Sequence, residues 1–228
     1  MLAGPMILDD ESTWPKELAQ MLDEHASLLE QYEAEARRID RLCEQDPVHR
    51  ANPPENLHRR SREKFLYKVD EFLQDKTLVG YHCTRLHEEE IKSILEIGLL
   101  PLSKGTTENR ISKLQERGEL AESIAQKLRQ HNWADGRVFE GNRSGIIWFV
   151  LTRSLLYSED GYGISSFFRY WGGEAIYAPH EDDPYISSVL QQIGTPCIIE
   201  AVLTIDSVKT YGSMGEKFLC EFLHRRGV

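Results

Sequence analysis

Three short segments of the chain carry side chains that could bind a small ligand by stacking, hydrogen bonding and charge. Tyr81-His82-Cys83-Thr84 follows a short apolar stretch, Gly145-Ile146-Ile147-Trp148-Phe149 contains a tryptophan, and Trp171-Gly172-Gly173-Glu174 ends in a carboxylate. A histidine donates and accepts hydrogen bonds, an indole offers a π-face, and a carboxylate balances positive charge. The paired glycines allow the backbone to approach a ligand closely. We therefore treat these segments as the candidate site.

Other kinds of catalytic site are not indicated. The chain has no H-E-x-x-H stretch, and His82 and His87 are five residues apart at a strand-to-helix junction, so no metal site is predicted. Nothing around Cys83 or Cys197 suggests an activated thiolate, which disfavours a cysteine hydrolase. The absence of a P-loop and of a G-x-G-x-x-G stretch argues against kinases, NTPases and dinucleotide dehydrogenases.

Strands and helices must alternate to position these residues. Leu78–His82, Gly145–Leu151 and Cys197–Ile205 are predicted as strands from their length and their branched and aromatic content. Leu86–Ile97 has helical periodicity, and Gly98 stands where a helix end favours a left-handed residue. Further expected elements are a charged helix or inserted lobe at Asn109–Gln130, a short helix at Ser165–Tyr170, a strand or strand start at Glu174–Tyr177, and a strand or short helix at Lys217–Leu223.

The first third of the chain is predicted to be helical. Apolar residues recur at helical spacing from Leu18 to Cys43, behind a cap at Ser12 or Thr13 and a proline that suits a first turn. The proline-containing segment Asp46–Pro54 is predicted as a loop, and a second amphipathic helix includes Phe65–Leu73. The two apolar stripes must be covered, either by the rest of the chain, by a second copy or by a partner protein.

Composition indicates a folded soluble protein. Of 228 residues, 40% are hydrophobic and 28% charged, and the net charge of -10 argues against a broad surface for duplex nucleic acid. Four scattered cysteines form neither a zinc pattern nor a disulfide scaffold, which is typical of a reducing cytoplasm. The acidic N-terminus is not a signal peptide, and no apolar run reaches the ~20 residues of a membrane-spanning helix, so we expect a cytoplasmic protein without a membrane partner.

The candidate segments also resemble a known family. Tyr81-His82-Cys83-Thr84, followed by a helix and Gly98-Leu99-Leu100-Pro101, resembles the opening of ADP-ribosyltransferases of the diphtheria-toxin and poly(ADP-ribose) polymerase (H-Y-E) type. It is also similar to the opening of the tRNA 2′-phosphotransferases, which share that fold. Gly145–Phe149 is similar to the second motif of the family, with Trp148 where the family has tyrosine. The resemblance extends over roughly Leu78–Ile205.

The resemblance implies an α+β fold with split antiparallel β-sheets and flanking helices. Residues 77–228 would form the ADP-ribosyltransferase-like domain, with a helical insertion around residues 109–144. Residues 1–76 would precede it as a helical extension.

The resemblance further implies that NAD is the substrate and that no metal is needed. His82 would bind a ribose hydroxyl, and the backbone groups of Cys83 or Thr84 beside it would hold the carboxamide. Trp148 would stack on the nicotinamide ring, and a second aromatic wall would come from Tyr157, Tyr162 or Phe168.

A carboxylate must steady the cationic sugar that forms when nicotinamide leaves. Glu174 is preferred because it follows two glycines at the start of an expected strand, as in the family. A further strand follows it in this chain, so Glu200, Glu216 and Glu221 stay open as alternatives.

The expected function is NAD-dependent ADP-ribosyl transfer, or NAD cleavage, on a protein or nucleic-acid acceptor, as in a toxin or effector. The alternatives are a catalytically inactive binding module that acts through its helical extension and a tRNA 2′-phosphotransferase. For the latter, only Arg85 and Arg153 stand out as phosphate ligands. The remaining basic residues of the middle region are predicted to form a solvated helix face, with contact to a phosphate as the alternative: Arg110, Lys113, Arg117, Lys127 and Arg129.

Overall fold

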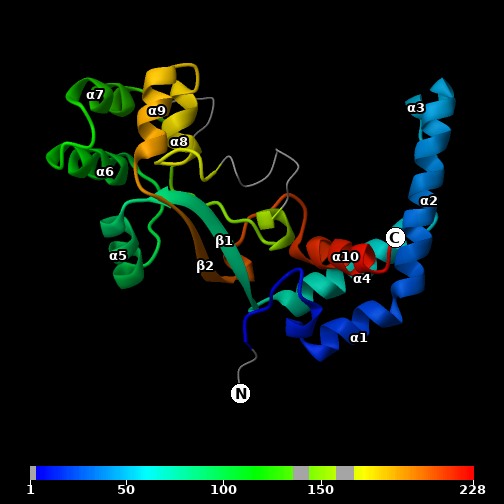
Figure 1. Cartoon of the computed structure of the whole chain (residues 1–228). Coiled ribbons are helices and arrows are strands. Elements are labelled where there is room, and N and C mark those ends of the chain that lie inside the picture. Colours follow the sequence, from blue (N-terminus) through cyan, green and yellow to red (C-terminus); the bar gives the residue numbers. More distant parts are fainter. Residues whose placement is uncertain (1–3, 136–143, 158–166) are drawn as a thin grey trace. The chain divides into compact units, whose positions relative to one another are not determined.

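The computed structural model describes residues 4–135, 144–157 and 167–228. The described chain is α+β and combines helices with one two-stranded antiparallel sheet, formed by β1 (Thr77–Leu86) and β2 (Thr195–Thr204) (Figure 1). The coarse fold class and the two strands predicted near residues 78–82 and 197–205 are thus confirmed, but β1 continues to Leu86, so His82 lies within the strand and not at its end. The predicted pair of sheets is not confirmed, because the described residues contain only this one sheet.

The chain divides into two compact units, residues 1–80 with 202–228 and residues 81–201. This differs from the predicted boundary near residue 76, because the C-terminal segment groups with the N-terminal helices. Among the described residues, no helix combines the length and apolar character that crossing a membrane requires.

The first unit is helical. It contains α1 (Lys16–Glu24), α2 (Ala26–Gln45), α3 (Pro47–Ala51), α4 (Arg59–Leu73), α10 (Met214–Arg225) and the 3₁₀ turns η1 (Glu11–Thr13) and η6 (Ile205–Ser207). Its core is made of buried apolar side chains from the predicted stripes, including Leu18, Leu22, Leu29, Phe65, Val69 and Leu73.

Two predictions for the N-terminal helices need correction. The helical periodicity from Leu18 to Cys43 predicted one helix, but the helix is broken at His25, whose ring donates Nδ1–H to the carbonyl of Met21 at 2.9 Å and stacks on Phe65. The break allows α1 and α2 to pack against α4 separately. The predicted loop after Asp46 contains the short helix α3, because the Asp46 side chain accepts a hydrogen bond from the Val48 amide.

The final helix packs on α4 (Figure 1). Phe218, Leu219 and Phe222 of α10 are buried. The Gly215 amide donates to Asp70 at 2.7 Å, and Arg62 forms an ion pair with Glu216. These contacts resolve the prediction of a strand or a helix at Lys217–Leu223 in favour of a helix, and they place α10 in the N-terminal unit.

The second unit holds the candidate site. It contains α5 (Glu88–Ile97), α6 (Lys104–Glu116), α7 (Glu122–Gln130), α8 (Glu174–Tyr177), α9 (Pro184–Gln192) and the 3₁₀ turns η2 (Trp133–Asp135), η3 (Ser154–Tyr157) and η5 (Ala178–His180). The buried core of this unit joins α6 and α7 to α8 and α9 through apolar residues that include Ile111, Leu128, Trp171, Ile176 and Leu190. Helices α6 and α7, which belong to the region predicted as an insertion, are therefore part of this core.

The helix after β1 is confirmed. His87 and Glu90 form a capping box at the start of α5, in which Glu90 accepts a hydrogen bond from the His87 amide at 2.8 Å. Gly98 ends the helix with φ of 83°.

The segment predicted as a buried strand at Gly145–Leu151 is irregular. Its single β-bridge joins Val150 to Tyr81, and Ile146 and Trp148 are 47% and 58% exposed. Its apolar side chains line a cavity instead of entering a sheet, which is why composition alone predicted the wrong element.

Two further predictions around the glycine pair are wrong or incomplete. Glu174–Tyr177 forms the short helix α8 and not a strand, because Gly173 turns the chain with φ of 65° and Ala175 and Ile176 are buried in the helical core. Of the predicted helix at Ser165–Tyr170, residues 165 and 166 lie outside the described ranges, and residues 167–169 form a turn.

Candidate functional site

The second unit contains a cavity of about 610 Å³, within the usual size range of small-molecule sites. Its walls come from the end of β1, from α5, α6 and residues 146–150, and from residues 172–175. The structure brings five of the predicted site residues to this cavity: His82, Cys83, Thr84, Trp148 and Glu174.

Hydrogen bonds hold the first two candidate segments side by side. The amides and carbonyls of Tyr81 and Val150 bond reciprocally at 2.8 and 2.9 Å. Next to this bridge, His82 Nδ1 lies 2.8 Å from the carbonyl oxygen of Trp148. A carbonyl only accepts, so Nδ1 carries the hydrogen and the neutral ring has its acceptor at Nε2.

The surroundings of His82 favour this neutral form. Desolvation lowers the pKa of His82, the hydrogen bond to the Trp148 carbonyl opposes the shift, and the charge of Arg110 adds to it. The ring of Phe149 meets the imidazole edge-on at a centroid distance of 6.0 Å and helps to fix its orientation. His82 is therefore an oriented hydrogen-bonding group in the wall of the cavity.

The two residues after His82 differ in what they offer. Burial raises the pKa of the Cys83 thiol to about 11, so this side chain is an uncharged wall and not a nucleophile. Thr84 is 5% exposed, and its hydroxyl makes a long contact of 3.5 Å to the Arg85 carbonyl. Both residues line the cavity.

Trp148 lies at the cavity with 58% of its surface exposed, so it is not a core residue. An indole in this position offers its face to a ligand, although no regular strand supports it.

Glu174 begins α8 and lines the cavity, and the residues before it explain its position. Trp171 is fully buried and donates its amide to the Leu190 carbonyl at 3.0 Å. Gly172 has φ of 86°, and a Cβ there would lie 2.6 Å from the side chain of Ile176. A buried tryptophan and a turn that only glycine fits therefore place the carboxylate.

The second aromatic wall was predicted from Tyr157, Tyr162 or Phe168. Phe168 does not line the cavity, whereas its neighbour Phe167 does. Tyr162 and the side chain of Tyr157 lie outside the described part of the chain.

The alternative carboxylates are not at the cavity. Glu200 lies on β2 with its side chain 62% exposed, 3.9 Å from a terminal nitrogen of Arg153. Glu216 and Glu221 belong to α10, in the unit that does not contain the cavity, and Glu216 is ion-paired with Arg62.

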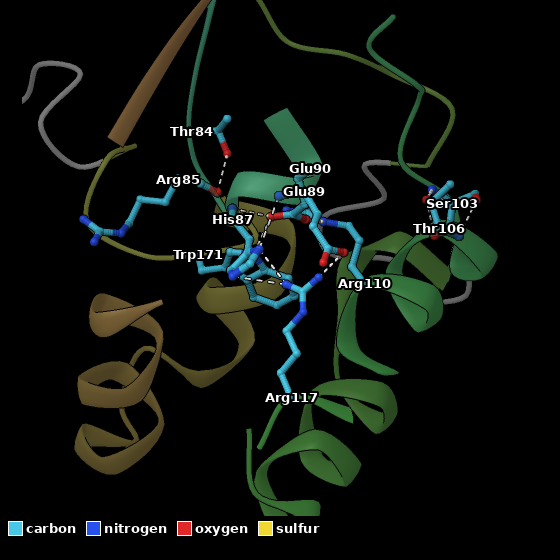
Figure 2. Close-up of polar contacts among 10 residues, drawn as sticks. All are labelled: Thr84, Arg85, His87, Glu89, Glu90, Ser103, Thr106, Arg110, Arg117 and Trp171. Atoms are coloured by element: carbon cyan, nitrogen blue, oxygen red, sulfur yellow. Dashed lines mark hydrogen bonds and ion pairs between the residues drawn. The ribbon is translucent and has the colours of Figure 1, made fainter. Parts of the chain in front are cut away.

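A polar network in the wall was missed by sequence reasoning (Figure 2). Glu90 accepts hydrogen bonds from Arg110 Nε at 2.5 Å and from Trp171 Nε1 at 2.9 Å, and the Arg110 guanidinium lies 4.7 Å from the centroid of the Trp171 ring. Burial disfavours the ionised form of Glu90, but the Arg110 charge and the donated hydrogen bonds outweigh it and lower the pKa of this carboxyl.

The predicted solvated face of the middle helices is only partly correct. Lys113 is exposed, as predicted, whereas Arg110 and Arg117 are partly buried and form ion pairs with Glu90 and Glu89. All three side chains line the cavity. Their spacing of three and four residues was a signal that they share one helix face, but it does not reveal what that face contacts.

The two arginines singled out as phosphate ligands have other partners. Arg85 donates to the carbonyls of Ile193, Gly194 and Phe168 at 3.0, 2.8 and 3.1 Å, and it lies apart from the Glu90 network in Figure 2. Arg153 donates to the Tyr81 hydroxyl at 2.7 Å. Arg85 thus connects the end of β1 to the backbone of residues 193–194 and of Phe168 by hydrogen bonds.

The described residues contain no group of three or more histidine, cysteine, aspartate or glutamate side chains placed to hold a metal ion. Comparison of the chain with protein-family models, with curated proteins and with solved structures finds no match.

Proposed function

We propose that the cavity binds NAD and that the protein transfers its ADP-ribosyl group to an acceptor or to water. One observation carries this proposal: His82, Trp148 and Glu174, drawn from three separate segments, line one cavity of about 610 Å³. An oriented imidazole, an exposed indole and a carboxylate are the groups that a nicotinamide riboside requires.

Each residue has a role that its surroundings support. Trp148 stacks on the nicotinamide ring, since it lines the cavity and 58% of its surface is exposed. His82 accepts a hydrogen bond from a ribose hydroxyl at Nε2, because Nδ1 donates to the Trp148 carbonyl. Glu174 lies against the ribose and balances the charge that develops on it.

The reaction breaks the bond between the ribose anomeric carbon and the nicotinamide nitrogen, and the bonding electrons leave with neutral nicotinamide. An acceptor oxygen or nitrogen, or water, then forms a bond to the anomeric carbon and loses its proton. The Glu174 carboxylate lowers the barrier by stabilising the cationic sugar between these events.

The same geometry favours an enzyme over an inactive binding module, since both His82 and Glu174 line the cavity. It disfavours 2′-phosphotransfer through Arg85, whose guanidinium donates to three backbone carbonyls.

Titration calorimetry of the full chain with NAD tests the proposal. We expect saturable binding that His82→Ala weakens by about tenfold, since such a hydrogen bond contributes about 1.4 kcal/mol. His224→Ala is the matched control, because His224 is exposed on α10 in the unit without the cavity. Absence of binding at millimolar NAD, or equal affinity in both variants, would contradict it.

A further inference from the structure

One face of α6 forms part of the cavity wall. Thr106, Arg110, Lys113 and Arg117 line the cavity at spacings of three and four residues, so they form a stripe along the helix. The neighbouring stripe of Thr107, Ile111 and Leu114 is buried. The buried stripe fixes the rotation of α6 and thereby directs the basic stripe toward the cavity.

The three basic side chains of this stripe differ in how many hydrogen bonds and ion pairs they already form within the protein. Arg117 contacts His87 and pairs with Glu89 (Figure 2). Arg110 is held by Glu90 through Nε and lies over the Trp171 ring, but its terminal nitrogens make no hydrogen bond within the described residues. Lys113 makes neither a hydrogen bond nor an ion pair with any residue that the structure describes.

The cavity wall therefore carries the oriented guanidinium group of Arg110 and, one helical turn away, the ammonium group of Lys113. Arg110 is oriented on both sides, by a carboxylate and by an indole, so little conformational freedom is lost when its terminal N–H groups bind a ligand. Residues three apart on a helix have Cβ atoms about 5–6 Å apart, so the long side chains of Arg110 and Lys113 can reach two adjacent phosphate groups.

The charge of Lys113 is not offset within the described residues. The Arg110 and Arg117 charges are offset by Glu90 and Glu89, whereas Lys113 forms no ion pair with any described residue. The anionic diphosphate of NAD would supply a partner of opposite charge for Lys113.

We infer that Arg110 and Lys113 bind the diphosphate of a dinucleotide whose nicotinamide end lies at His82 and Trp148. This inference rests on the proposed function and adds the part of the substrate that α6 recognises.

The test is calorimetric titration of the full chain with three ligands: NAD, nicotinamide riboside, which lacks the diphosphate, and ADP-ribose, which lacks the nicotinamide. Lys113→Ala is the informative variant because no described residue depends on this side chain for a partner. Lys92→Ala is its matched control, since Lys92 is an exposed lysine of α5 that does not line the cavity.

We expect Lys113→Ala to weaken NAD and ADP-ribose by roughly tenfold and to leave nicotinamide riboside unchanged, as a charge-assisted contact to phosphate predicts. Added salt should weaken NAD binding less in this variant than in the unmodified protein. Lys92→Ala should have no effect on any of the three ligands.

The outcomes separate this inference from the proposed function. NAD binding that depends on His82 but not on Lys113 would overturn the diphosphate site and leave the function standing. ADP-ribose binding that depends on Lys113, with NAD binding indifferent to His82, would support the diphosphate site and contradict the function. No binding of either diphosphate ligand at millimolar concentration would overturn the inference.

Discussion

At the scale of single residues, the site depends on how neighbours orient and tune a few side chains. His82 was predicted from its place after a strand, and the structure adds what sequence does not contain: its tautomer, set by the Trp148 carbonyl, and its partial desolvation. Glu90 was not predicted, because its partners Arg110 and Trp171 are 20 and 81 residues away along the chain. Contacts of that range leave no local pattern.

The lowered pKa of His82 has a consequence for stability. Its folded pKa is below the unfolded value of about 6.5, so the unfolded state takes up a proton first as the pH falls. The contribution of neutral His82 to the free energy of unfolding is fully present above about pH 6.5 and is lost as the pH falls through the lower pKa of the folded state.

Urea unfolding between pH 5 and pH 8 checks this, with His82→Gln as the comparison because it removes the titrating group. We expect the free energy of unfolding of the unmodified protein to decline toward pH 5 more steeply than that of the variant. Burial is the main cause that lowers the pKa of His180. This histidine is present in both proteins, so its effect cancels from the difference between their free energies of unfolding. Parallel pH profiles would contradict the account.

At the scale of elements, local signals predicted β1, α5 and β2 well. Their ends are marked by residues with local roles, such as the His87–Glu90 capping box and Gly98. The segments at Gly145–Leu151 and Glu174–Tyr177 were predicted wrongly because tertiary packing decides them. In the first, apolar side chains line a cavity, and in the second, burial of Ala175 and Ile176 stabilises a helical turn.

Gly194 connects α9 to β2 at a point of close backbone approach. It has φ of 68°, and a Cβ would lie 2.7 Å from the carbonyl group of Leu86 at the end of β1. We expect Gly194→Ala to lower the free energy of unfolding by about 2–4 kcal/mol, since both left-handed strain and a backbone clash oppose it.

Gly118→Ala is the control that separates backbone strain from the clash. Gly118 also has a positive φ, of 73°, but no atom lies within 4 Å of the position that a Cβ would take. This variant should cost about 1 kcal/mol, from strain alone. Chemical denaturation of the two variants is the measurement, and equal losses would show that the approach of Gly194 to Leu86 has no energetic effect.

At the scale of the whole molecule, the last helix of the chain, α10, belongs to the N-terminal unit. The sequence predicted residues 77–228 as one domain because nothing local to α10 identifies its partner. The structure pairs it with α4 through Phe218, Leu219 and Phe222. The apolar stripes of the N-terminal helices, expected to need a cover, thus obtain part of it from the other end of the chain.

A fragment of residues 77–228 should therefore fail to keep α10 folded. Burial of each large apolar side chain contributes roughly 1.5–3 kcal/mol, and the fragment lacks the surface that buries them. Hydrogen exchange should find the amides of Met214–Arg225 protected in the full chain and unprotected in the fragment. Equal protection would support the boundary predicted from sequence.

The most direct test of the central claim is the release of nicotinamide from NAD, followed by chromatography, in the unmodified protein and in Glu174→Gln. Glutamine keeps the size and hydrogen-bonding capacity of the side chain and removes the charge that would stabilise the cationic sugar. We predict slow release by the unmodified protein and a loss of about a hundredfold or more in the variant, with NAD affinity retained. Equal release by both proteins, or no release by the unmodified protein at saturating NAD, would contradict the account.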